Sequence, residues 1–462
     1  MARTSSAPAG ATVDESITET LAQFVTECGP SDVPSTVRDQ AAWWTLDWLG
    51  CAIAGLGTPP GQMMIQHTLA QPDAGCAALG LARGRSAQVA ALHNGAVSHI
   101  VEMDDVDRES VIHPAAVIVP AALAVGEQLG KSGRDVLAAI ALGYEVAIRV
   151  GGAVGKTHYF HWHNTATCGV FGAATAAGWL LGLDARQMVW ALGSAGTQAG
   201  GLWEFIADGA MSKHLHAGRA AANGVLAAEL ASLGFTGARR VLEGRQGFFA
   251  ATAPDGDTGR ITRALGDGWK LPGVSIKPYP SCRHTHSAID AALALRREHG
   301  VRSDDVQTVQ IDGYRSVLDL TDNPSPRHLY AAKFSVQYCV ARALLDGAVR
   351  LDDFSDARIF EPAASRLMGD SAVRLDPELD ARYPAQFPAR VTVKLRDGRA
   401  LSQLVLSPKG DPEVPLSQDE LTGKFTGMLR GTAYERQADW LVDQVAGLDA
   451  RGDISGLLGL PS

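Results

Sequence analysis

The chain has 462 residues, which is longer than a single hydrophobic core usually becomes, so we expect more than one domain. The hydrophobic fraction of 46% is typical of a soluble globular protein, and the net charge of −9 argues against nucleic acid or an anionic membrane as a partner. The six cysteines are far apart and form no CxxC pair, which argues against a disulfide framework, a zinc knuckle or an iron–sulfur cluster.

The N-terminal residues 1–14 lack the apolar core of a signal peptide, and we expect them to form a short disordered tail. No run of about 18 apolar residues follows, so the sequence predicts no transmembrane helix. Unpaired thiols fit a reducing compartment, and together these features predict a cytoplasmic location.

The spacing of apolar residues predicts a large helical domain that begins with residues 15–269. Pro59 and Pro60 predict a break after the second helix. Glycine and alanine are abundant in this part, so the helices are expected to pack closely. The predicted helices cover residues 16–28, 35–56, 86–101, 114–129, 134–151, 167–182, 186–199 and 216–234.

Residues 270–407 have a different pattern, which predicts a smaller α+β domain. Residues 306–313 alternate apolar and polar side chains like a strand, and residues 389–406 predict a hairpin that turns at Asp397 and Gly398. Helical stretches at 283–298, 332–347 and 361–369 lie between them. Residues 415–448 are helical again, so residues 408–462 are expected to rejoin the first domain. The fold class is thus mainly α, with the α+β domain as a lid.

An acidic stretch over residues 99–114 is the first candidate for chemistry, and it ends in a His-Pro step. Pro114 suits the first turn of a helix, so His113 is expected near a helix N-terminus, which attracts anions. Carboxylates such as Glu102 and Asp104 can orient a histidine or bind a divalent cation. A solvated loop with helix-capping aspartates is the alternative.

The second candidate contains three histidines, His158, His161 and His163, beside aromatic residues. Their spacing matches neither an HExxH motif nor a zinc-finger pair, so we predict no metal. The alternative is an aromatic surface loop.

Two later segments gather cations at the start of predicted helices. Cations there are disfavoured by the helix dipole unless an anion binds, which suggests an anionic ligand. The alternative is a polar helix start with its side chains in water. The first segment contains Lys213, His214, His216 and Arg219, and the second, at the predicted domain junction, contains Lys277, Ser281, Arg283, His284 and His286.

No cofactor motif accompanies these segments. The sequence has no GxGxxG after a strand, no P-loop and no GxSxG nucleophile elbow. Lys213 as a Schiff-base lysine for pyridoxal phosphate is a further alternative, but no phosphate-binding loop is evident. We therefore expect no cofactor.

Five stretches resemble, in order and spacing, the MmgE/PrpD family, which includes 2-methylcitrate dehydratase, cis-aconitate decarboxylase and iminodisuccinate epimerase. They are EMDDVDRESVIHP, HNTATCGVFGAA, MSKHLHAGRAAANG, KPYPSCRHTHSAIDAA and KFSVQYCVARALLDG, and the resemblance covers about residues 15–450. It implies a helical domain formed by both chain ends, a smaller α+β lid, a homodimer, and catalysis without metal, iron–sulfur cluster or organic cofactor.

The resemblance also implies a set of site residues. Matching the motifs residue by residue gives either Glu102 or Asp104 as the acidic residue, followed by a lysine and histidines from the other segments. We assign catalytic roles to Asp104, His113, His163, Lys213 and His286, and substrate binding to Glu102, His216, Lys277, Ser281 and Arg283.

Two departures from the family pattern bear on the reaction. Val106 stands where the family pattern has a threonine, and the stretch from Asp104 to His113 is one residue longer than in the decarboxylases. We therefore expect a cofactor-independent lyase of the 2-methylcitrate dehydratase type, which removes a proton next to a carboxylate of a hydroxy di- or tricarboxylate. The alternatives are an epimerase of an amino-dicarboxylate such as iminodisuccinate, a cis-aconitate-type decarboxylase and, least expected, a non-enzymatic scaffold.

Overall fold

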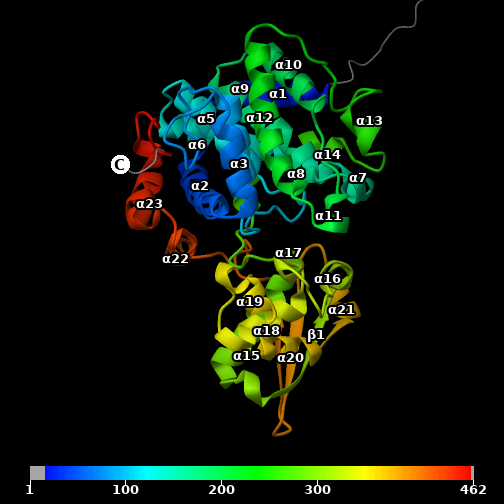
Figure 1. The fold of residues 1–462 in the computed structure, drawn as a ribbon. Helices are drawn as coiled ribbons and strands as arrows, with labels where there is room; N and C mark the ends of the chain where they lie inside the picture. Colours follow the sequence, from blue (N-terminus) through cyan, green and yellow to red (C-terminus); the bar gives the residue numbers. More distant parts are fainter. Residues whose placement is uncertain (1–15, 459–462) are drawn as a thin grey trace, which may run out of the picture.

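The computed structural model describes residues 16–458, and the tail predicted for residues 1–14 lies outside them. Helices make up most of the described part, which also contains a four-stranded sheet (Figure 1). The mainly helical character predicted from the sequence is therefore correct.

The elements of the described part are α-helices, short 3-10 helices (η) and β-strands. The α-helices are α1 (Ile17–Glu27), α2 (Ser35–Leu56), α3 (Pro59–Leu69), α4 (Ala87–Ser98), α5 (Ala115–Gln128), α6 (Gly133–Ala153), α7 (Gly155–His161), α8 (Asn164–Thr167), α9 (Gly169–Leu180), α10 (Ala185–Gly196), α11 (Phe205–Asp208), α12 (Ser212–Ser232), α13 (Phe248–Thr252), α14 (Gly259–Thr262), α15 (His286–His299), α16 (Arg315–Thr321), α17 (Leu329–Lys333), α18 (Val336–Asp346), α19 (Asp356–Ile359), α20 (Pro362–Gly369), α21 (Pro377–Asp380), α22 (Gln418–Leu429) and α23 (Ala438–Ala446). The 3-10 helices are η1 (Leu271–Gly273), η2 (Arg283–Thr285), η3 (Ser303–Asp305), η4 (Leu351–Asp353), η5 (Glu435–Gln437) and η6 (Leu448–Ala450). The strands are β1 (Val306–Gly313), β2 (Ser371–Leu375), β3 (Ala389–Leu395) and β4 (Ala400–Val405).

Most predicted helices are present, but the prolines after α2 do more than break the chain. Pro59 and Pro60 begin α3, which the sequence analysis missed. Thr58 caps this helix, because its Oγ1 accepts a hydrogen bond from the Gly61 N–H at 3.2 Å. Proline is favoured in a first helical turn, where no N–H donor is required.

Two other predicted helices have different limits. The helix expected over residues 167–182 is divided at Cys168, with α8 before it and α9 after it. The helix expected from residue 216 begins at Ser212, so Lys213 and His216 lie inside the first two turns of α12. The two side chains are therefore fixed to a helix.

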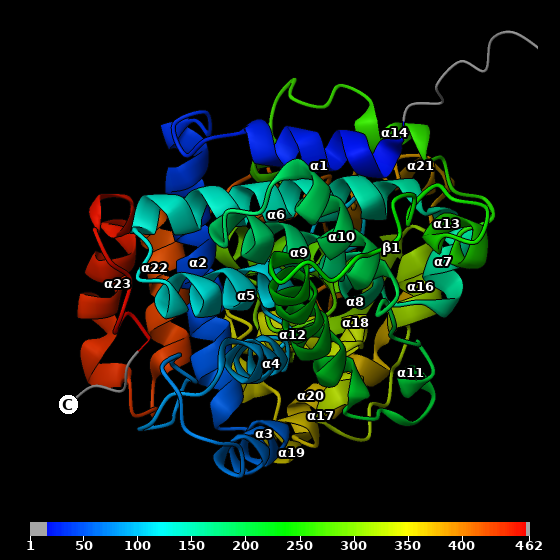
Figure 2. The ribbon, with the colours of Figure 1, turned by 90° about the horizontal axis from the view of Figure 1, so that it is seen from above.

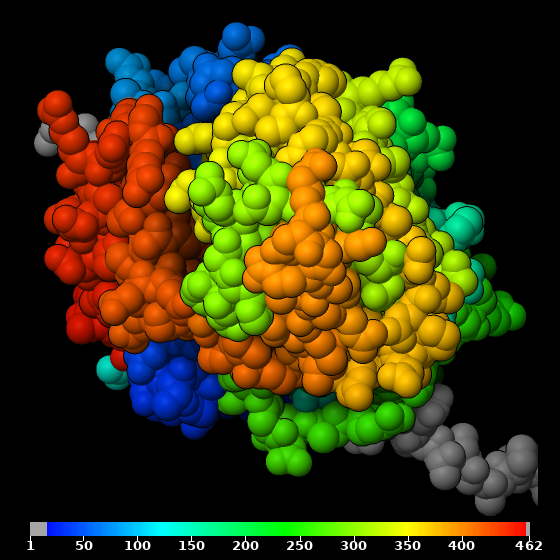
Figure 3. Space-filling view, turned by 90° about the horizontal axis from the view of Figure 1, so that it is seen from below, coloured from blue at the N-terminus to red at the C-terminus, as the bar shows by residue number. Residues whose placement is uncertain are grey.

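Buried hydrophobic side chains form two clusters, which define a larger and a smaller unit. The larger cluster includes residues from Leu21 to Val274 and from Phe425 to Leu458, so both ends of the described chain build it. The smaller cluster includes residues from Ala288 to Leu395. Figure 2 looks onto the larger unit, where α22 and α23 lie beside α2, and Figure 3 shows the smaller unit from below. The domain limits 15–269 with 408–462, and 270–407, remain a prediction.

The sheet belongs to the smaller unit and has the strand order β2-β1-β3-β4. Strand β1 pairs in parallel with β2 and antiparallel with β3. Strands β3 and β4 form the predicted hairpin, and Gly398 adopts a positive φ of 92° in the turn. Strand β2 was not predicted.

Among the described helices, α6 is long and apolar enough to cross a membrane by length and composition. However, 94% of its apolar window is buried inside the protein, as in the core helix of a globular unit. Figure 2 shows α6 packed among the other helices of the larger unit.

Glycines bring α12 close to α4 and α5. A Cβ atom on Gly218 would lie 2.3 Å from the Leu92 carbonyl oxygen, and one on Gly95 would lie 3.1 Å from the Gly218 Cα. The expected close packing of small residues is therefore realised where α12 meets α4. This contact sets the position of Lys213, one turn and a half before Gly218.

We expect Gly218→Ala to lower the free energy of unfolding by about 2 kcal/mol, because the added methyl group forces α12 away from α4. Urea denaturation measures the effect. The control is Gly423→Ala in α22, where a Cβ atom meets nothing within 4 Å. Because alanine favours a helix more than glycine does, the free energy of unfolding of this variant should be unchanged or slightly higher. Equal stabilities of the two variants would contradict the close contact.

Candidate active site

Glu102 lies in the loop that connects α4 to α5, and its carboxylate is buried between two lysines. Its Oε1 accepts a hydrogen bond from Lys213 Nζ, and its Oε2 lies 3.7 Å from Lys277 Nζ. Burial by itself raises the pKa of Glu102, but the charges of the two lysines outweigh it and hold the pKa well below its usual value. The backbone of Glu102 has a φ of 60°, which is unfavourable for a residue with a side chain.

Asp104 lies on the same loop and is completely buried. Its Oδ2 accepts a hydrogen bond from His99 Nδ1 at 2.6 Å and lies 3.3 Å from His113 Nδ1, and its Oδ1 lies 3.6 Å from Lys277 Nζ. Burial opposes the charged form, yet the charges of these neighbours hold the pKa of Asp104 well below its usual value. Asp104 is therefore a carboxylate that orients two imidazole rings.

The His113 ring is held in one tautomer. Its Nδ1–H donates to the Asp105 carbonyl oxygen at 2.6 Å, so its Nε2 carries the lone pair of the neutral ring. Burial lowers the pKa of His113 to about 4, so the ring is neutral at pH 7. The Asp105 side chain accepts hydrogen bonds from Tyr144 Oη at 2.8 Å and from the Ala115 N–H at 3.1 Å, which ties the loop to the start of α5. The neutral His113 ring thus has a proton acceptor in Nε2.

Four aromatic rings continue the cluster toward α12. The centre of the His163 ring lies 5.6 Å from that of His99, on which it stacks, and 4.7 Å from that of Trp203. The two Nδ1 atoms of His163 and His216 lie 3.3 Å apart, so one ring donates to the other. Burial, with nearby positive charges, holds the pKa of His163 well below its usual value. Side chains of the first three candidate segments therefore lie together in the structure, whereas their predicted roles remain predictions.

A cavity of about 550 Å³ borders this cluster at His216. One face of α12 and the loop before α11 form its walls. The lining residues are Gln198, Gly200, Gly201, Leu202, Glu204, Phe205, Ser212, Leu215, His216, Arg219 and Asn223.

Lys277 of the fourth motif contacts the acidic loop, and the rest of that motif forms a hydrogen-bonded group of its own. Arg283 donates from Nη1 to His286 Nδ1 at 2.8 Å, and its Nη2 pairs with Asp411. His286 Nε2 donates to the Ser281 carbonyl oxygen at 3.2 Å, so both nitrogens of this ring are engaged. The Ser281 hydroxyl bonds the Thr285 hydroxyl at 2.8 Å. The roles assigned to Ser281, Arg283 and His286 remain predictions, and in this structure the Arg283 and His286 side chains bind each other while the Ser281 hydroxyl bonds Thr285.

Two histidines of the second motif lie apart from the cluster. His158 is buried and bonds Thr167 Oγ1 through Nε2 at 2.8 Å, with Thr252 near its Nδ1. His161 is exposed. Of the three histidines, only His163 contacts the cluster. The alternative of an aromatic surface loop is wrong for the other two, because both lie on α7 and His158 is buried.

Sequence reasoning missed two buried groups in the same region. His99 contacts both Asp104 and His163, although the sequence analysis gave it no role. Lys333, from the smaller unit, donates from Nζ to the Val101 carbonyl oxygen at 2.5 Å. Both residues lie in or next to stretches quoted for the resemblance, but only their orientation shows that they belong to the site.

The ligand atoms of His99, Asp104 and His113 lie within 4.8 Å of one another, as in many metal sites. In this structure, however, His99 Nδ1 donates to Asp104 Oδ2 and His113 Nδ1 donates to the Asp105 carbonyl oxygen, while Lys277 supplies positive charge to the Asp104 carboxylate. His99 Nε2 and Asp104 Oδ1 are buried without a hydrogen-bond partner, and the expectation of no metal remains a prediction.

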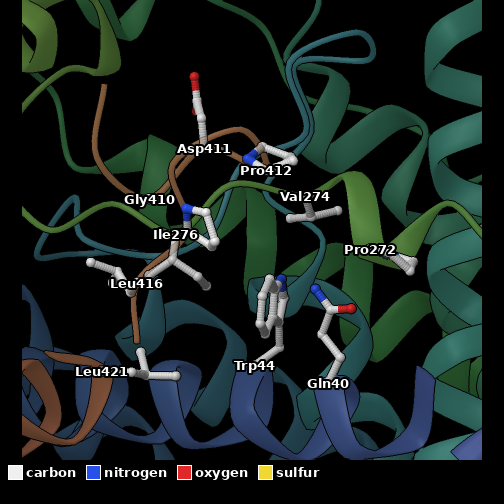
Figure 4. A pocket seen from close by; sticks show the side chains of 11 residues that line it. Gln40, Trp44, Pro272, Val274, Ile276, Gly410, Asp411, Pro412, Leu416 and Leu421 are labelled. Carbon is white, nitrogen blue, oxygen red and sulfur yellow. The ribbon is translucent and has the colours of Figure 1, made fainter. Parts of the chain in front are cut away.

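A second cavity, of about 260 Å³, lies where the two connecting segments pass between the units (Figure 4). Gln40 and Trp44 of α2 face Val274 and Ile276 of one segment and Pro412 of the other. The described residues that line it include Asp411, the partner of Arg283, but none of the ten predicted site residues.

The structure thus defines a class of mainly helical proteins in which a smaller unit with a sheet meets a larger helical unit beside buried carboxylates, lysines and neutral histidines. Within this class, the chain belongs to the MmgE/PrpD family. Residues 19–260 match the MmgE/PrpD N-terminal domain, and residues 279–448 match the MmgE/PrpD C-terminal domain. The resemblance predicted from the five stretches is confirmed.

Several relatives align over nearly the whole chain. A "cis-aconitate decarboxylase-like protein oryM" of Aspergillus oryzae is 29% identical, with 98% of each chain covered. Cis-aconitate decarboxylase of Aspergillus terreus is 28% identical over 96% of this chain and 95% of its own. A mitochondrial 2-methylcitrate dehydratase of Yarrowia lipolytica is 26% identical over 35% of this chain and 33% of its own.

We expect the free energy of unfolding to fall as the pH is lowered from 6.5 toward about 4. Burial lowers the pKa of eight histidines in the folded state, so in this range the unfolded chain binds more protons and stability is lost as pH falls. Together, these eight histidines should lower the free energy of unfolding by at least ~3 kcal/mol over this pH range. They are His93, His113, His158, His163, His214, His216, His284 and His286.

Urea denaturation at about pH 7.5 and about pH 5 tests this expectation, because stability changes with the difference in protons bound by the two states. An unchanged free energy of unfolding between the two conditions would mean that these rings titrate normally in the folded protein.

Proposed function

We propose that this protein is a lyase that acts on a small di- or tricarboxylate by moving a proton at a carbon next to a carboxylate. The observation that carries the proposal is the neutral His113 ring, with its lone pair on Nε2, close to the Asp104 carboxylate and the buried Lys277. The names of the relatives, which are decarboxylases and dehydratases of small carboxylates, support it.

Dehydration of a hydroxy di- or tricarboxylate is the first candidate reaction. His113 Nε2 takes the proton from the carbon, and the electron pair of that C–H bond forms a carbon–carbon double bond. The neighbouring C–O bond breaks, and the hydroxyl group leaves as water after it receives a proton. The His113 ring, protonated by the first step, supplies this proton and returns to its neutral form, while the neutral His163 and His216 rings share a hydrogen bond beside it. Lys213 and Lys277 hold the substrate carboxylate and stabilise the developing negative charge.

Decarboxylation is a second candidate, and the length of the alignments favours it. The relatives that cover nearly all of the chain carry the name cis-aconitate decarboxylase, whereas the dehydratase covers about a third. Against it stands Val106, whose buried side chain has no hydroxyl group where the family pattern has a threonine. The same His113 and lysines would serve either reaction.

Incubation of the protein with a panel of di- and tricarboxylates in deuterated water, followed by NMR and mass spectrometry, tests the proposal. Deuterium uptake with loss of water indicates dehydration, and uptake with loss of CO₂ indicates decarboxylation. Uptake with inversion at carbon would replace the lyase with the epimerase alternative. Absence of both deuterium exchange and loss of water or CO₂ across the panel would refute all three activities.

We expect His113→Ala to lower kcat by about 10²- to 10⁴-fold, because the variant lacks the base that removes the proton. The steady-state rate on the substrate found in the panel measures the change. His67→Ala is the matched control, since His67 is an exposed histidine of α3 and should leave the rate unchanged. A His113→Ala rate close to that of the control would rule out the role as base.

We expect removal of divalent cations by dialysis against EDTA to leave the rate unchanged, because the proposed steps use histidines and lysines alone and Lys277 already lies 3.6 Å from the Asp104 carboxylate. Elemental analysis of the purified protein gives a second readout. One equivalent of bound metal, together with loss of activity in EDTA and recovery on adding the metal back, would instead make the three residues metal ligands.

A further inference from the structure

Lys333 ends α17 of the smaller unit and reaches into the larger unit. Its Nζ donates to the Val101 carbonyl oxygen at 2.5 Å, one residue before Glu102. The side chain is buried, and its Nζ lies 5.7 Å from the centre of the Phe354 ring. No part of the site described so far gives this lysine a function.

The charges around Lys333 do not balance. Within residues 16–458 it makes no ion pair, and the charged groups within electrostatic reach are the carboxylates of the acidic loop and two further lysines. Both carboxylates already have partners, since Glu102 contacts Lys213 and Lys277, and Asp104 contacts Lys277 and two histidines. Three ammonium groups therefore face two carboxylates, which leaves one buried positive charge in excess.

An ammonium group without a counter-ion is costly in a buried place. Burial, reinforced by Lys277 and Lys213 and opposed by Glu102 and Asp104, lowers the pKa of Lys333 to about 8. The group is nevertheless mostly protonated at pH 7. One of its three N–H donors is used by Val101, so two remain for an acceptor that brings a negative charge.

We propose that Lys333 binds a carboxylate of the substrate, as the one substrate contact from the smaller unit that completes the group of Lys213 and Lys277. The inference rests on the proposed function, because it names how that site selects a substrate with more than one carboxylate. Lys213 and Lys277 hold the carboxylate next to the reacting carbon, and Lys333 holds a further one. A monocarboxylate lacks this second contact and should bind weakly.

Binding through Lys333 requires its ammonium form. Above pH 8 the free lysine loses its proton, so the affinity for the polycarboxylate should fall. The other titratable groups near Lys333 are two carboxylates, two lysines and one histidine. Glu102 and Asp104 stay charged in this range because the pKa of each is lowered, and His214 stays neutral because burial lowers its pKa to about 4. The two lysines are Lys213 and Lys277.

The experiment measures binding of tricarballylate, a tricarboxylate without a hydroxyl group to eliminate, by calorimetry at several pH values from 7 upward. Lys333→Gln keeps a donor for the Val101 carbonyl but removes the charge, and Lys333→Arg keeps the charge. We expect Lys333→Gln to raise the Kd about tenfold or more and to abolish its dependence on pH near 8, with Lys333→Arg within about threefold of wild type. Lys394→Gln, on the exposed side of β3, is the control and should match wild type.

An unchanged Kd and pH profile in Lys333→Gln would overturn the inference while leaving the proposed lyase activity in place. If the wild-type protein neither binds tricarballylate nor converts any carboxylate of the panel, both the inference and the proposed function fail. Thermal melting of each variant shows whether it folds. If Lys333→Gln does not fold, the pH dependence of tricarballylate binding by the wild-type protein tests the inference instead. An affinity that stays constant well above pH 8 would overturn the role of Lys333.

Discussion

The buried Glu102 carboxylate between Lys213 and Lys277 is the interaction on which the site depends. A carboxylate removed from water is costly unless opposite charges and hydrogen bonds surround it, and loss of one partner of such a pair typically costs about 3–5 kcal/mol. The two lysines come from positions 111 and 175 residues further along the chain, on α12 and on the segment that leads to the smaller unit. Pairing with them also holds Glu102 in its unfavourable backbone conformation.

The same burial that requires paired charges keeps the histidines neutral. His113 and His163 lie beside lysines in a place with little water, and both effects disfavour an imidazolium ion. A cluster can therefore hold positive charge on lysines, for binding a carboxylate, and lone pairs on imidazoles, for moving a proton. In water, a histidine with its ordinary pKa is partly protonated near pH 7. The protonated fraction of such a ring has no lone pair with which to accept a proton.

Local patterns in the sequence were sufficient for most helices, for β1 and for the β3–β4 hairpin, because apolar spacing and turn residues act over short distances. They also pointed to the segments of the site. They could not show which side chain of a segment turns inward, so His158 and His161 resembled His163 although only His163 contacts the cluster. Nor could they show that Arg283 pairs with Asp411, a residue 128 positions away, or that His99 lies against Asp104. Such contacts depend on the tertiary fold.

The position of the site also links its chemistry to the way in which the two units meet. Val106 and Ser275 pair through their backbones where the chain leaves the larger unit, and Ile276 bonds the Gly410 carbonyl oxygen where the chain returns. Lys277 follows this crossing directly, so the lysine that contacts Glu102 and Asp104 is fixed by the junction itself. Because the lysines approach the acidic loop from both units, an anion bound among them would attract groups on each side. The charge balance in the site and the contact between the two units therefore depend on the same charged side chains. A ligand carboxylate bound among them affects both.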